Sequence, residues 1–147
     1  MKFIKEEYNH FYQAHQNVWN ILFHVFCGAV FTSCLILLLP SAYYAMFIAL
    51  FLTLVWISLP MTMHVFVSLS SVLLIFFGIL SAFEMSNNTL LLIAILFYFL
   101  PELSHIITQE KTALNIKNIT VLNVWINIMY LLPFSVKTLF YSGKLIP

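Results

Sequence analysis

Long apolar runs constrain the fold of this chain more than any other feature. Five runs reach about the length an α-helix needs to cross a bilayer, roughly 20 residues. They occupy approximately 18–39, 42–59, 61–83, 89–107 and 119–141. The chain is 63% hydrophobic and 7% charged, whereas soluble domains are about 45–50% apolar and about 25% charged. We therefore expect an all-α integral membrane helical bundle with four or five transmembrane helices, built from residues 1–147 as a single membrane domain.

Polar and proline-containing segments separate the runs. Pro40 and Pro60 divide the first three runs, and proline is tolerated at helix ends but not inside them. Polar stretches at 84–88 and 108–118 divide the others. The fifth run contains Asn123, Asn127 and Pro133, so it is either a kinked span or a segment partly in the interface. Residues 1–16 form a polar N-terminal segment before the first run.

Lysine positions predict the orientation of the bundle. Lysines remain mainly on the cytoplasmic side of a membrane, and Lys2 and Lys5 place the N-terminus there. With the spans above, the loop carrying Lys111 and Lys117 falls on the same side, whereas Lys144 falls outside if the fifth run crosses. We expect a bacterial inner membrane or, in a eukaryote, the endoplasmic reticulum. A net charge of +1 argues against a nucleic-acid partner.

This topology places all five histidines of the chain near one leaflet: His10, His15, His24, His64 and His105. Polar groups within membrane segments are costly and tend to be functional. Several neutral imidazoles in an apolar pocket suit iron, zinc or copper. His15, His24 and His105 are the strongest ligand candidates. His64 is either a ligand or an isolated interfacial histidine, and we expect His10 to be solvated.

Helical geometry places a condition on the first two candidates. Nine residues at 100° each put His15 and His24 on opposite sides of one continuous helix. Both can reach one site only if the chain bends between them. Asn17 is a plausible N-cap at such a bend, while Asn17, Asn20 and His24 share one helix face. Asn20 either serves the site or bonds a neighbouring helix.

The segment 101–110 is the second polar intrusion. Glu102, His105 and Gln109 share a helix face, and Pro101 leaves a backbone carbonyl without its usual donor. Glu-x-x-His is a spacing found in carboxylate-bridged metal sites. Glu102 is therefore a candidate ligand, a partner that orients His105, or one half of an interfacial pair with a lysine.

These residues resemble a known family. Tyr12-x-x-His15-x-x-x-x-Asn20-x-x-x-His24 is similar to the N-terminal signature of membrane-bound 2-hydroxy fatty acid dioxygenases. The second signature of that family is Gly-His, then a Glu four residues on, then Pro-Ala-Leu. The corresponding stretch here begins at Ser104-His105 and ends at Ala113-Leu114. Gln109 occupies the usual glutamate position, with Glu110 one residue later, and Thr112 replaces the proline.

The resemblance implies Fe(II)-dependent α-oxidation, in which a 2-hydroxy fatty acid reacts with O₂ and loses one carbon. It carries His15, Asn20, His24 and His105 into the site, with Glu110 as the carboxylate. The middle of the chain contains no motif specific to the family, and His64 has no counterpart in the family signatures. Lys111 or Lys117 could attract the substrate carboxylate.

Two other classes of function remain open from the residues alone. One is a membrane haem b protein with two axial histidines, and the other is a small transporter or scaffold with histidines as proton relays. The chain lacks the internal repeats common in transporters. It also lacks aspartate, which excludes a Ser-His-Asp triad, and Cys27 and Cys34 are expected to be free thiols.

Overall fold

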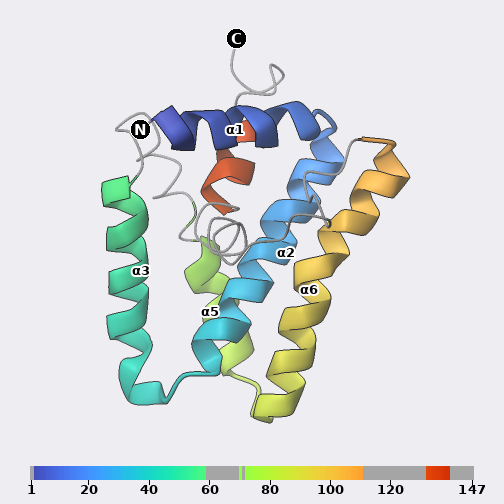
Figure 1. The fold of residues 1–147 in the computed structure, drawn as a ribbon. Coiled ribbons are helices and arrows are strands. Elements are labelled where there is room, and N and C mark those ends of the chain that lie inside the picture. The colour runs from blue at the N-terminus through green and yellow to red at the C-terminus, as the bar shows by residue number, and fades with distance from the viewer. Residues whose placement is uncertain (1, 59–69, 71, 111–131, 140–147) are drawn as a thin grey trace.

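The computed structural model describes residues 2–58, 70, 72–110 and 132–139, and these residues form helices and turns without a β-strand (Figure 1). This confirms the all-helical expectation for the described part of the chain. The elements are α1 (Lys2–Ala14), α2 (Val18–Leu37), the 3₁₀ turn η1 (Ser41–Tyr43), α3 (Tyr44–Ser58), α5 (Val72–Ser81) and α6 (Asn87–Thr108). Residues 132–139 form a further short helix.

Helix α2 is the centre of the bundle, and both α5 and α6 pack against it. Asn17 caps its first turn by accepting a hydrogen bond from the backbone N–H of Trp19, as the sequence predicted. Small buried residues, Gly28, Ala29 and Ser33, allow neighbouring backbones to approach closely. The Ser33 hydroxyl donates to the carbonyl of Leu73 at 3.3 Å, which fixes α5 against α2.

Helix α6 runs beside α2 and brings its C-terminal end to the start of α2 (Figure 1). Ser86 caps its first turn. Gln109 ends it in a left-handed conformation with φ 57°, which is uncommon for a residue other than glycine. Its outward face is apolar and exposed. That face includes Leu91, Leu92, Ile95, Leu96, Phe99, Leu103, Ile106 and Ile107.

Helix α1 lies across the ends of the upright helices rather than continuing α2 (Figure 1). The bend predicted near Asn17 is therefore present, between Ala14 and Val18. The underside of α1 packs on the short helix 132–139, where the rings of Tyr8 and Phe11 lie 5.4 and 5.9 Å from the ring of Phe134. These contacts place α1 over the bundle.

The predicted number of membrane spans is confirmed only in part. Among the described residues, α2 and α6 are long and apolar enough to cross a membrane by length and composition. Helix α3 provides 15 described residues of the predicted run 42–59, fewer than the roughly 20 that a span needs, and the residues directly after Ser58 lie outside the described part. The runs 61–83 and 119–141 lie partly outside the described residues, where α5 and helix 132–139 are the described portions.

Candidate metal centre

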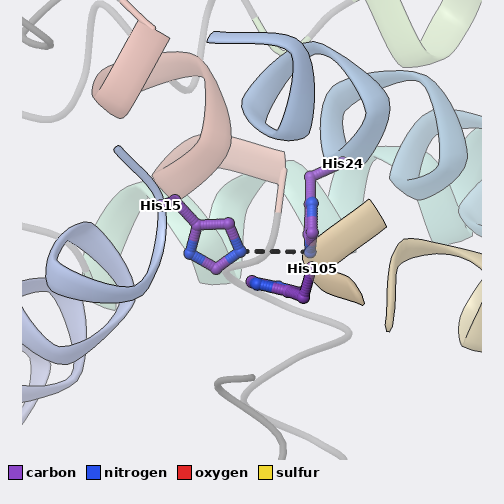
Figure 2. A group of neighbouring side chains, drawn as sticks. All are labelled: His15, His24 and His105. Carbon is purple, nitrogen blue, oxygen red and sulfur yellow. Dashed lines mark hydrogen bonds between the residues drawn. The ribbon is translucent and has the colours of Figure 1, made fainter. Parts of the chain in front are cut away.

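Three buried imidazoles meet where α1, α2 and α6 converge (Figure 2). His15 lies in the bend after α1, His24 in the second turn of α2 and His105 near the end of α6. Their exposed fractions are 0%, 3% and 1%. One potential ligand nitrogen from each ring lies within 4.8 Å of the other two. This cluster could hold a metal ion.

His15 and His24 are both anchored through Nδ1. The Nδ1–H of His15 donates to the carbonyl of Phe11 at 2.6 Å, and the Nδ1–H of His24 donates to the carbonyl of Asn20 at 2.9 Å. Since a neutral imidazole carries one ring proton, each Nε2 then presents a lone pair. The two Nε2 atoms are 3.1 Å apart, joined by the dashed line in Figure 2.

The pair is held in its uncharged form. Burial lowers the pKa of His15 to about 2, and the neighbouring His24 contributes in the same direction. The ring of Phe11 stacks on His15 with centroids 3.8 Å apart, covering one face of the imidazole. Two lone pairs facing each other in a buried site repel, and a cation between them removes that repulsion.

His105 has a different environment. The amide nitrogen of Asn20 donates to Nδ1 of His105 at 3.2 Å and to Oε2 of Glu110 at 2.5 Å. Because Nδ1 accepts, the ring proton lies on Nε2, and Nε2 is buried without a hydrogen-bond partner in the described part of the chain. Nε2 of His105 can bind a metal only after it loses this proton. The Nε2 atoms of His15 and His24, in contrast, already carry the lone pairs that a metal needs.

Glu110 joins the end of α6 to the bend that carries His15. Its Oε1 accepts from the backbone N–H groups of Gln16, at 2.5 Å, and Asn17, at 2.6 Å, while Oε2 accepts from Asn20. Partial burial acts to raise the pKa of Glu110, but the hydrogen bonds from Asn20 and the two backbone groups outweigh burial and lower it. Glu110 therefore remains ionised and positions the bend and Asn20.

The other predicted candidates that the structure describes are not part of this cluster. Glu102 is half-buried on α6 and, within the described ranges, forms no hydrogen bond or ion pair. It is not part of the group that could hold a metal. Gln109, expected on the same helix face, is the C-cap of α6. His10 is exposed on α1, and His64 lies outside the described residues.

Two residues of the site were not identified from the sequence. Ser104 donates its hydroxyl to Oδ1 of Asn20, and Phe11 stacks on His15. Ser104 precedes His105 directly, at the position of the family glycine, which was a usable signal. Phe11 had no such signal, because aromatic residues are abundant throughout this chain. Cys27 and Cys34 are free and buried, as expected.

Comparisons with known proteins do not add to this geometry. Scans against family models, curated proteins and solved structures each return no match. The molecule is thus defined by its own features: its described residues are helical, two of the described helices are apolar and long enough to cross a membrane, and three buried histidines form a cluster.

Proposed function

We propose that this chain is a membrane-bound, Fe(II)-dependent dioxygenase that shortens 2-hydroxy fatty acids by one carbon. The observation that carries the metal centre is the 3.1 Å separation of two buried Nε2 atoms whose ring protons lie on the opposite nitrogens. The choice of substrate comes from the resemblance of the two histidine signatures to the 2-hydroxy fatty acid dioxygenases.

The distance between the two nitrogens fits neighbouring ligands on one ion. Metal–imidazole bonds of about 2.0–2.1 Å put adjacent ligand atoms roughly 3.0–3.4 Å apart. Opposite ligands, such as two axial histidines of a haem, are about 4 Å apart at the same bond length. The observed 3.1 Å between His15 and His24 therefore favours a single small ion over a bis-histidine haem.

Three histidines suit iron, zinc and copper, and they leave open positions on the ion for other ligands. Iron is proposed because α-oxidation needs a redox-active metal. When bound, Fe(II) would mediate electron transfer from the 2-hydroxy acid to O₂ and offer a site for the carboxylate of the substrate. The overall reaction is balanced: R–CH(OH)–COOH and O₂ give R–COOH, CO₂ and H₂O.

The residues of the chain have separate tasks in this proposal. His15 and His24 hold the ion through Nε2, with Nδ1 fixed by backbone carbonyls. His105 is the third ligand, and Asn20 controls which of its ring nitrogens carries the proton. Glu110 positions Asn20 and the bend, and Phe11 shields His15 from water. Such partners of metal ligands tune ligand orientation and basicity.

A membrane setting suits both the chain and the proposed substrate. The exposed apolar face of α6 is the kind of surface that lipid covers. With the N-terminus in the cytoplasm, the histidine cluster lies at the cytoplasmic boundary of the membrane. A 2-hydroxy fatty acid can leave its acyl chain in the apolar layer while its polar end reaches the cluster. We propose the bacterial inner membrane or the endoplasmic reticulum.

Metal analysis combined with product analysis tests this function. Protein purified without an affinity metal should contain about one iron per chain, lack a Soret band and convert 2-hydroxypalmitate and O₂ to pentadecanoate and CO₂. His24→Ala should lose both iron and product formation. His10→Ala is the matched control, because His10 is exposed on α1, and it should keep both. Iron and O₂-dependent turnover retained in His24→Ala would contradict the proposal.

A further inference from the structure

A cavity lies at the opposite end of the α2–α6 pair from the histidine cluster. Its volume is about 410 Å³, within the range of roughly 300–1,000 Å³ typical of small-molecule pockets. The end of α2, the start of α3, the end of α5 and the start of α6 all contribute to its lining. The cavity is therefore formed by four elements and does not belong to the metal centre.

Glu84 is the charged residue of this cavity. Between Glu7 and Glu102 the sequence contains no other lysine, arginine, aspartate or glutamate. Unlike Glu110, Glu84 forms neither a hydrogen bond nor an ion pair with any residue that the structure describes. The chain thus places an isolated negative charge on a cavity wall and supplies no described cation for it.

The end of α2 adds negative potential to the same cavity. Leu37, Leu38 and Leu39 line it, and the end of a helix carries the negative end of the helix dipole. The backbone N–H groups of Leu38 and Leu39 already bond the carbonyls of Cys34 and Ile36. The Tyr44 hydroxyl donates to the carbonyl of Leu37 at 3.4 Å. A positively charged ligand would be attracted by Glu84 and by this helix end together.

Two aromatic side chains, Tyr44 and Phe83, also line the cavity. Aromatic faces attract alkylammonium groups, and a carboxylate combined with aromatic rings is a favourable setting for quaternary and primary amines. We propose that this cavity binds an alkylammonium group, namely the ethanolamine or choline headgroup of a phospholipid.

The position of the cavity supports a lipid as the source of the amine. The 20 residues of α2 span about 30 Å, the thickness of the hydrocarbon core of a bilayer. The cavity lies at the C-terminal end of α2, roughly 20 Å along the helix from His24. If α2 crosses the membrane, the cavity lies at the headgroup level of the opposite leaflet. Headgroups that lack an amine, such as phosphatidylglycerol, offer Glu84 no cation. This site depends on the membrane setting and not on the metal.

Native mass spectrometry of the protein released from mixed nanodiscs tests the site. With equal phosphatidylethanolamine, phosphatidylcholine and phosphatidylglycerol, the wild type should retain the two amine lipids roughly tenfold over phosphatidylglycerol, given modest charge and cation–π contributions. Glu84→Gln should lose this preference, and Glu84→Asp should keep part of it. Glu102→Gln is the matched control and should behave as the wild type, because Glu102 does not line the cavity.

Three results would overturn the proposal. They are equal retention of phosphatidylglycerol by the wild type, an unchanged preference in Glu84→Gln, and loss of the preference in Glu102→Gln. Displacement of bound lipid by free choline at an affinity equal to that of the lipid would assign the cavity to a soluble amine instead. Metal content measured on the same samples separates this result from the proposed function, since Glu84→Gln should bind metal normally.

Discussion

The polar side chains at the two ends of the α2–α6 pair differ in burial and in hydrogen bonding. At the histidine end, His15, Asn20 and His24 are buried. The two histidines donate to backbone carbonyls, and the Asn20 side chain donates to His105 and Glu110. At the other end, Glu84 is exposed on an open cavity and has no partner among the described residues. The chain itself supplies the partners of the polar groups at the histidine end, whereas the exposed Glu84 carboxylate at the other end is open to solvent and to a ligand.

The largest loss of metal affinity is expected from removing His15 or His24. His15→Ala or His24→Ala should weaken metal binding by more than ~100-fold, above the roughly 10–100-fold that losing a partner of a ligand typically costs. Isothermal titration with Fe(II) or a Co(II) surrogate under anaerobic conditions measures this directly. His10→Ala should bind as the wild type, and an unchanged affinity in His24→Ala would show that the cluster is not the metal site.

A smaller effect should follow changes around the third histidine. Asn20→Ala removes the amide that bonds Nδ1 of His105 and Oε2 of Glu110, so we expect a metal affinity about 10–100-fold lower. His105→Ala should fall between Asn20→Ala and the loss of His15 or His24, because His105 must first move its proton. If His105→Ala lost as much metal affinity as His24→Ala, His105 would need no proton movement before it binds the metal.

The sequence predicted much of the histidine cluster because the positions of its residues follow from helical periodicity and capping. Helical phase showed that His15 and His24 cannot share a straight helix, and an asparagine suited to capping marked the bend at Asn17. The long apolar run 89–107 then brought His105 to the same side as His24. Each step depended on periodicity within one helix or on the order of long helices.

What the sequence could not predict lies beyond the helix ends. Glu110 follows Gln109, whose left-handed conformation redirects the chain, so helical periodicity says nothing about where its carboxylate lies, and only the family resemblance pointed to it. Glu102 had the better spacing for a metal site, yet it lies on α6 outside the cluster. The contact of α1 with Phe134 joins residues more than a hundred positions apart, and no local pattern encodes it.

Glu110 can be tested as a positioning residue rather than a ligand. Glu110→Gln keeps the size of the side chain but removes the charge that accepts the N–H groups of Gln16 and Asn17. We expect stability to fall by about 1–2 kcal/mol, since hydrogen bonds to charged groups contribute about 1.5–3 kcal/mol when buried and less here. Metal affinity should fall about tenfold, with the metal coordination spectrum retained.

The control for this change is Glu102→Gln, which alters the same residue type within α6, the helix that precedes Glu110, without breaking a described bond. Its free energy of unfolding should stay within about 0.5 kcal/mol of the wild type. Denaturant unfolding and X-ray absorption at the metal edge give the two measurements. A changed first coordination sphere in Glu110→Gln would identify Glu110 as a ligand and reject the positioning role.

The smallest effect on the folded protein should come from Glu84. Because its carboxylate is exposed and unpaired, Glu84→Gln should change the free energy of unfolding by less than about 0.5 kcal/mol and leave metal affinity unchanged. Thermal unfolding in detergent free of amine lipids measures the first, and metal titration the second. If amine lipid is then added, only the wild type should gain stability, because a ligand stabilises the state it binds. If Glu84→Gln were destabilised in lipid-free detergent, the Glu84 carboxylate would have a stabilising partner within the chain itself.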